Sequence, residues 1–131
     1  MAYEVNHTDD EWREILTKDE FRVLRRAGTE PSFDNEYWDN QESGAYNCRA
    51  CGRPLFDSEH KFESGCGWPS FTKPTDEAAT EARVDTSFGM HRTEVRCSRC
   101  GSHLGHVFRD GPPPLGMRYC INSLSLRFVP K

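Results

Sequence analysis

Two short motifs hold four of the six cysteines, and their spacing is typical of metal ligands. Residues 48–55 (CRACGRPL) and 97–104 (CSRCGSHL) share the pattern CxxCGxxL and lie 49 positions apart. Two residues between the cysteines let both thiolates reach one ion across a tight turn, and the glycine that follows can adopt a left-handed backbone there. Together the motifs supply four sulfur ligands for one structural Zn²⁺ ion. We therefore expect a zinc site formed by Cys48, Cys51, Cys97 and Cys100.

Other interpretations of these cysteines are open. Each motif is also found as a redox-active pair or as two buried thiols, and iron binds four sulfurs in rubredoxin-like sites. The 45 residues between the motifs exceed the spacing of a compact zinc ribbon, so the metal would join distant strands. Zinc held by four cysteines has no open coordination position, which predicts a role in stability and not in catalysis.

The two remaining cysteines lie in settings that suit thiol chemistry. Cys66 stands between two glycines in the string SGCGWPSF, which predicts a loop that can move its thiol. Cys120 lies in a predicted strand where alternation places Arg118, Cys120 and Asn122 on one face. A thiol between a cation and an amide forms a thiolate more readily than one in an apolar core. Burial as a small apolar side chain is the alternative for both cysteines.

Two histidines follow the second cysteine motif in the string HLGHVF, residues 103–108. Three positions along a strand put His103 and His106 on opposite faces, so both reach one site only with a bulge at Gly105. A single histidine is more often a hydrogen-bonded structural residue. In the same way Trp68, in a loop rich in glycine and proline, is more often packed in a core than in contact with a substrate.

The N-terminal residues predict short helices. The strings TDDE and TKDE, which begin at Thr8 and Thr17, match the capping box of a helix start. The pattern predicts a first helix with a buried face, a second helix that ends in a left-handed cap at Gly28, and a third short helix over residues 31–38. The apolar residues expected on the inner faces of the first two helices are Trp12, Ile15, Leu16, Phe21 and Leu24.

From Gly44 onward the pattern changes to short runs broken by Gly, Pro, Asp and Ser. Residues 80–86, 91–96 and 124–129 alternate as strands with one solvated face, and residues 111–116 form a loop. We expect a mainly β fold: a compact antiparallel β-sandwich or barrel-like body with an N-terminal arm of short helices. Residues 1–131 would form a single domain, with the helical arm over 1–42 and the zinc-clamped body over 43–131.

Composition excludes several classes of protein. The 131 residues carry a net charge of −4, which divides into −7 for residues 1–42 and +3 for the remainder. A strongly basic domain is absent, so nucleic acid is not an expected partner. The sequence contains no run of about 18 apolar residues, so a membrane is not expected. Its first residues lack the basic and apolar regions of a signal peptide, so secretion is not expected. We expect a cytoplasmic protein that is a monomer.

Several longer strings resemble the B-type methionine sulfoxide reductases, which reduce the R epimer of peptidyl methionine S-oxide. The resemblance covers about residues 10–130, and its strings occur in the family's order. They are GTE at 28–30, EYW at 36–38, both CxxC motifs, SGCGWPSF at 64–71, HLGHVF at 103–108, DGP at 110–112 and RYCINS at 118–123.

The resemblance implies a structural zinc and an oxidoreductase that repairs oxidised proteins. It implies that Cys120 attacks the sulfoxide and becomes a sulfenic acid, and that Cys66 resolves it in a disulfide recycled by thioredoxin. It places His103, His106, Asn122 and Arg118 on the polar side of the pocket, with Trp68 against the substrate methyl group. A non-catalytic zinc-ribbon-like module that binds protein or RNA is the alternative, and it would need neither Cys66 nor Cys120.

Overall fold

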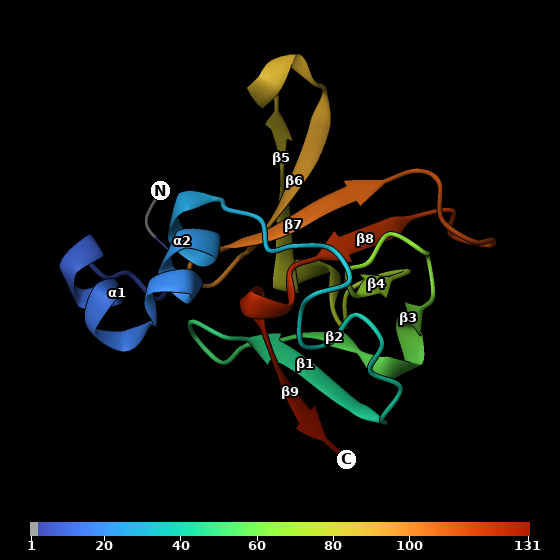
Figure 1. Cartoon of the computed structure of the whole chain (residues 1–131), viewed down its shortest axis with the longest axis horizontal. Helices are drawn as coiled ribbons and strands as arrows, with labels where there is room; N and C mark the ends of the chain where they lie inside the picture. Colours follow the sequence, from blue (N-terminus) through green and yellow to red (C-terminus); the bar gives the residue numbers. More distant parts are fainter. Residues whose placement is uncertain (1–2) are drawn as a thin grey trace.

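The computed structural model describes residues 3–131, and in these residues two short helices precede a body built from antiparallel strands (Figure 1). Helix α1 spans Asp9–Ile15 and helix α2 spans Lys18–Arg26. Thr8 and Thr17 are their N-caps, and each closes a capping box with the glutamate three residues later. Both predicted helix starts are therefore confirmed.

Two details of these helices differ from the prediction. Trp12 and Leu16 are buried, but Ile15 is 54% exposed, because at about 100° per residue its side chain points away from that of Leu16 around the helix. The left-handed residue after α2 is Ala27, not Gly28. Gly28 is needed for space instead, since a Cβ atom there would lie 2.9 Å from the carbonyl oxygen of Arg22.

The predicted third helix over residues 31–38 is wrong, since this segment consists of turns and bends. Its polar groups bind distant loops instead of the preceding helical turn. The backbone N–H of Phe33 donates to the carbonyl of Gly67, and that of Tyr37 donates to the Ser123 hydroxyl. The segment is thereby tied against the loop that carries Cys66.

The strands form two antiparallel sheets, whose order is β2-β1-β9 and β3-β4-β8-β7-β6-β5. The first sheet contains β1 (Gly44–Cys48), β2 (Pro54–Asp57) and β9 (Leu126–Pro130). The second contains β3 (Lys61–Phe62), β4 (Ser70–Phe71), β5 (Thr80–Asp85), β6 (Arg92–Cys97), β7 (His103–Phe108) and β8 (Arg118–Ile121). The predicted fold class, mainly antiparallel β with short N-terminal helices, is confirmed.

The strands predicted from alternation occur with small shifts at their ends. Strand β5 and strand β6 match the predicted runs to within one residue. Strand β9 begins two residues later than predicted, because Ser123–Ser125 form a 3-10 turn between β8 and β9. Residues 111–116 form a loop, as predicted.

The core lies between the two sheets and is rich in aromatic rings. Phe56 of β2 stacks on Phe71 of β4 with ring centroids 4.5 Å apart, and Tyr46 of β1 packs edge-on against Phe71. All three rings are fully buried, which stabilises the fold by about 1.5–3 kcal/mol for each large side chain. Among residues 3–131 no helix is long and apolar enough to cross a membrane.

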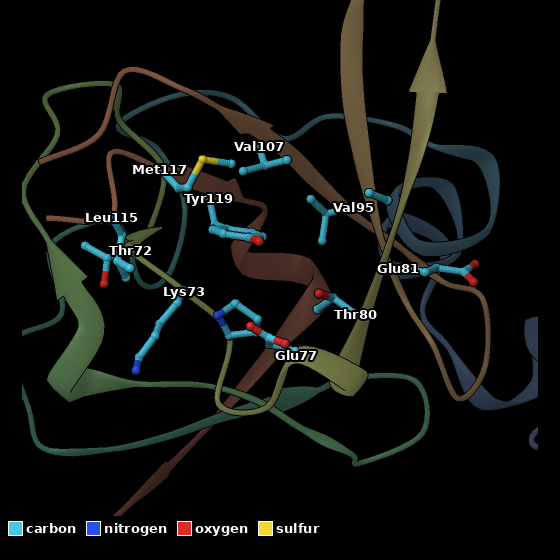
Figure 2. A pocket seen from close by; sticks show the side chains of 12 residues that line it. Thr72, Lys73, Glu77, Thr80, Glu81, Val95, Val107, Leu115, Met117 and Tyr119 are labelled. Carbon is cyan, nitrogen blue, oxygen red and sulfur yellow. The ribbon is translucent and has the colours of Figure 1, made fainter. Parts of the chain in front are cut away.

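The two faces of the six-stranded sheet differ in chemistry because its residues alternate between them. Val95, Val107 and Tyr119 line a cavity of about 410 Å³ on one face, together with Lys73 and Glu77 (Figure 2). None of the site residues predicted from the sequence lines this cavity. The intervening positions on β6, β7 and β8 carry the polar side chains of the other face.

Candidate active site and metal centre

The four cysteines of the two CxxC motifs come together in one cluster, as predicted. All four sulfur atoms lie within 4.8 Å of one another. Cys48 Sγ lies 3.7 Å from Cys100 Sγ, and Cys51 Sγ lies 3.6 Å from Cys97 Sγ. A regular tetrahedron with metal–sulfur bonds of about 2.3 Å has sulfur atoms about 3.8 Å apart. The cluster therefore has the size and the donor set that a tetrahedral metal ion requires.

The cluster joins the two sheets. Cys48 ends β1 of the three-stranded sheet, Cys97 ends β6 of the six-stranded sheet, and their partners lie in the turns that follow. In both turns the glycine after the second cysteine has a left-handed backbone, with φ of 83° at Gly52 and 75° at Gly101. A bound ion would therefore connect segments that are distant in sequence.

Cys66 and Cys120 face each other at a separate place, with their sulfur atoms 3.6 Å apart. Cys120 lies on β8, which pairs with β4 on one side and β7 on the other. Cys66 lies in the loop before β4, between Gly65 and Gly67, whose φ angles are 79° and 86°. Both thiols are free and about half-buried, so a disulfide would require the sulfurs to approach by about 1.5 Å.

The two thiols titrate as one unit because they share a hydrogen bond. This bond from Cys120, helped by the hydroxyls of Ser64 and Ser70, lowers the pKa of Cys66 to about 4. The same bond, together with burial, raises the pKa of Cys120, while the Arg118 guanidinium opposes that rise. The pair therefore carries one negative charge at neutral pH, with a cation beside it.

A small pocket of about 110 Å³ opens onto Cys120. Trp68, His106 and Asn122, which the resemblance placed around a substrate pocket, line it together with Cys120. Cys66 and Arg118 line a different, open depression of about 530 Å³. The two sulfurs thus connect two surfaces, with Cys120 facing the small pocket and Cys66 facing the open depression.

A bulge brings the two histidines to the same face of β7. Val95 pairs with Gly105 but Arg96 pairs with His103, so Leu104 is an extra residue without a partner on β6. The ring centroids of His103 and His106 consequently lie 5.5 Å apart. The predicted bulge is present, one residue before the predicted position at Gly105.

Each histidine is held by a carboxylate that sequence reasoning missed. His106 Nε2 lies 2.8 Å from Asp85 Oδ2, and His103 Nδ1 lies 2.6 Å from Glu94 Oε2. Burial lowers the pKa of His106, and Asp85 partly offsets this. Hydrogen bonds from Ser87 and His106 hold the pKa of Asp85 well below its usual range. His103 is buried behind His106 and does not line the small pocket, which differs from the sequence expectation.

Gly105 allows β7 and β8 to approach closely beneath this site. A Cβ atom at this position would lie 2.0 Å from the carbonyl oxygen of Cys120. Any side chain here would therefore displace the strand that carries Cys120.

Glu30 is a buried residue whose carboxyl group binds the chain after Asn122 and whose backbone binds two pocket residues. Its side chain accepts hydrogen bonds from the backbone N–H groups of Ser123 and Leu124, the latter at 2.9 Å. Its own backbone N–H donates to Asn122 Oδ1 at 3.2 Å, and its carbonyl accepts the Trp68 indole N–H at 3.0 Å. In the sequence Glu30 appears only as the last residue of the GTE string at 28–30, and no local pattern indicates this role.

Arg118 is fixed by a bidentate ion pair with Asp110. Its Nε and Nη2 atoms lie 2.8 and 3.1 Å from the two carboxylate oxygens, and its guanidinium covers the Phe108 ring at 4.4 Å. The cation is thereby held beside the thiol pair.

Comparison with known proteins agrees with this arrangement. A model of the SelR domain matches residues 16–130. Three similar proteins are called peptide methionine sulfoxide reductase MsrB. One from Thiobacillus denitrificans is 56% identical over 131 residues, covering 100% of this chain and 99% of that protein. One from Leptospira interrogans is 53% identical over 128 residues, with 98% of each chain covered. One from Thioalkalivibrio sulfidiphilus is 59% identical over 121 residues, with 92% of this chain and 88% of that protein covered. The chain therefore belongs to the SelR-domain family, that of the MsrB methionine sulfoxide reductases.

Proposed function

We propose that this chain reduces peptidyl methionine (R)-S-oxide to methionine by thiol chemistry, and so repairs oxidised proteins. The observation that carries the proposal is the Cys66–Cys120 pair, whose sulfurs lie 3.6 Å apart, with Cys120 opening onto a pocket that Trp68 and His106 also line. The family supplies the reaction class, and the R epimer follows from the family resemblance alone. The full chain acts as one reductase domain in this proposal.

The first step needs a thiolate and an acid together, because a sulfoxide sulfur is a weak electrophile until its oxygen is protonated. The Cys66 thiolate takes the Cys120 proton across their hydrogen bond, and Arg118 stabilises the new thiolate. Cys120 Sγ then attacks the substrate sulfur while the substrate oxygen is protonated, which forms a bond between the two sulfur atoms. The hydroxyl group next moves from the substrate sulfur to Cys120 Sγ as the bond between the sulfur atoms breaks. Methionine leaves reduced, and Cys120 becomes a sulfenic acid.

We assign the proton donor to His106, since it lines the pocket and His103 lies behind it. The Asp85 carboxylate accepts the Nε2 proton of His106, which favours the imidazolium form and leaves Nδ1 free to give up a proton. His103, held by Glu94, supports the His106 ring from behind. Trp68 would contact the substrate methyl group, and the Asn122 amide would orient the substrate oxygen.

The second step restores the nucleophile. The Cys66 thiol attacks the sulfenic sulfur of Cys120, the S–O bond breaks, water leaves, and a Cys66–Cys120 disulfide forms. An external dithiol, for which we propose thioredoxin, reduces this disulfide by exchange and is itself oxidised to a disulfide. The open depression of about 530 Å³ beside Cys66 offers that partner access to the more exposed sulfur.

The four-cysteine cluster would hold a structural Zn²⁺ ion through Cys48, Cys51, Cys97 and Cys100. Such an ion binds its thiolates firmly and links the two sheets. The redox couple then consists of Cys66 and Cys120, which lie outside the cluster. A monomeric cytoplasmic enzyme, with no nucleic-acid or membrane partner, remains part of this proposal.

A non-catalytic zinc-binding module is the rival, and it gives the thiol pair no purpose. The test is to incubate the protein with each epimer of a blocked methionine sulfoxide and to measure its intact mass and the methionine formed. We expect the R epimer to remove two hydrogens from the protein as one methionine appears. Cys66→Ser should gain one oxygen instead, and it should make one methionine without further turnover with thioredoxin.

Cys120→Ser is the decisive variant. It should form no methionine with either epimer while it keeps the folded far-ultraviolet circular dichroism spectrum. Methionine formation by Cys120→Ser, or a wild-type mass that neither epimer changes, would overturn the proposal.

A further inference from the structure

The hairpin of β5 and β6 projects from the body (Figure 1). Phe88 is 89% exposed and Met90 is 43% exposed, and we call these two residues the hairpin tip. Two large apolar side chains exposed on one turn can form part of an interaction surface.

The backbone holds Phe88 in this exposed position. Its φ angle is 56°, a left-handed conformation that is uncommon for a bulky residue and costs about 1–3 kcal/mol. The turn before it is fixed, because Asp85 Oδ1 accepts hydrogen bonds from the Ser87 backbone N–H at 3.0 Å and the Ser87 hydroxyl at 2.7 Å. The ring is thus presented to solvent by an ordered turn.

The hairpin tip is continuous with the small pocket. Asp85, at the end of β5, binds His106 of the pocket wall. Arg92, at the start of β6, lines the pocket and lies 3.3 Å from Asp85. On one side of the tip Arg92 lines the pocket, and on the other side Asp85 binds a residue of the pocket wall, so the tip extends from the edge of the pocket.

The size of the pocket determines what this surface meets. A volume of about 110 Å³ is well below the 300–1,000 Å³ of sites that enclose a whole small ligand, and it holds one side chain. The polypeptide on either side of an oxidised methionine must then lie outside, across the mouth. A methionine is often buried in a core, and its oxidation loosens that core and exposes the apolar residues packed around it.

We propose that the hairpin tip of Phe88 and Met90 is a docking surface for the apolar residues that flank methionine sulfoxide in a substrate polypeptide. This inference rests on the proposed function and deepens it. It makes the enzyme selective for sulfoxides in apolar segments over free methionine sulfoxide. The pocket recognises the sulfoxide, and the hairpin tip recognises its neighbours.

The test compares three substrates: a blocked single methionine sulfoxide, a heptapeptide with leucine and valine flanks, and a heptapeptide with serine and glycine flanks. Wild type should show a kcat/KM about fivefold higher for the apolar than for the polar heptapeptide, the effect expected from burying roughly half of a phenyl side chain. Phe88→Asn should lose this preference, since asparagine tolerates a positive φ and leaves the turn intact. Phe88→Leu should keep most of it.

Val84→Ser is the matched control. Val84 is 81% exposed on the same hairpin, but alternation along β5 points it away from the face that carries Asp85. It should keep the preference for the apolar heptapeptide. An unchanged preference in Phe88→Asn, or an equal loss in Val84→Ser, would overturn the docking surface. Activity on the single blocked residue tests the proposed function separately, and it should be the same in all of these variants.

Discussion

Replacement of Glu30 by glutamine probes how a buried carboxyl group positions the pocket. Glu30 is 3% exposed, and its two oxygens accept the backbone N–H groups of Ser123 and Leu124. Glutamine keeps the size of the side chain but replaces one acceptor oxygen by an NH₂ group. One of the two backbone N–H groups then faces another donor and loses its partner.

The magnitude follows from that single lost acceptor. A buried N–H without a partner costs about 1–3 kcal/mol. For a chain of 131 residues, the entropy of unfolding converts 1 kcal/mol into roughly 3–4 °C of melting temperature. We therefore expect Glu30→Gln to melt about 4–11 °C below wild type. Because Ser123 follows Asn122 directly, kcat/KM should fall as well.

The assay is thermal unfolding by circular dichroism, with kcat/KM on blocked methionine sulfoxide measured at a temperature where both proteins are folded. Glu14→Gln is the control, since Glu14 is exposed on α1 and its replacement should change melting by less than about 2 °C. If Glu30→Gln melts within 2 °C of wild type, the hydrogen bonds of Glu30 do not stabilise this part of the molecule and the reasoning is refuted.

Two further predictions concern the histidine and the metal. Asp85→Asn should lower the pKa of His106 further, because burial already lowers it and the lost carboxylate no longer offsets burial. The protonated form of His106 then exists only at lower pH, so the profile of kcat/KM against pH should shift to lower pH. The exposed control Asp34→Asn should not shift this profile, and an unshifted Asp85→Asn profile would argue against His106 as the acid. Removal of metal with a chelator should release about one zinc per chain and abolish cooperative unfolding. The reason is that binding of a structural zinc contributes about 10–16 kcal/mol to folding, against a total stability of about 5–15 kcal/mol for a protein. A metal-free protein that keeps its melting temperature would show that the cysteine cluster does not need an ion.

The features that were predictable from sequence are those whose interacting residues lie close together in the chain. The capping boxes at Thr8 and Thr17 involve groups three residues apart, so the sequence shows both partners. The CxxCGxxL repeat likewise shows each half of the metal cluster, and its duplication indicates that the halves meet. Alternation predicted Arg118, Cys120 and Asn122 on one face; Cys120 and Asn122 line the small pocket, whereas Arg118 lines the open depression.

The features that were missed depend on partners far away in the sequence. Residues 31–38 look helical locally, but their donors are satisfied by Gly67 and Ser123, which no local pattern reveals. Glu30 binds residues more than 90 positions away, and Asp85 binds His106 across 21 positions. The residue type does not reveal whether a carboxylate is buried or solvated, so the tertiary structure is needed to distinguish the two cases.

The position of Cys120 in the sheet has a consequence for how sulfur atoms approach one another. Strand β8 is an inner strand, bonded to β4 and β7 on its two edges, and Gly105 leaves no space beneath it. Its backbone therefore stays still when a bond to its sulfur is made or broken. The movement that brings the two sulfur atoms together would therefore come from the glycine-flanked loop of Cys66, which also carries Trp68. In the proposed mechanism that loop would move inward to close the bridge and carry the indole wall of the pocket with it, so the oxidised enzyme would differ in shape from the enzyme that is ready for a new substrate.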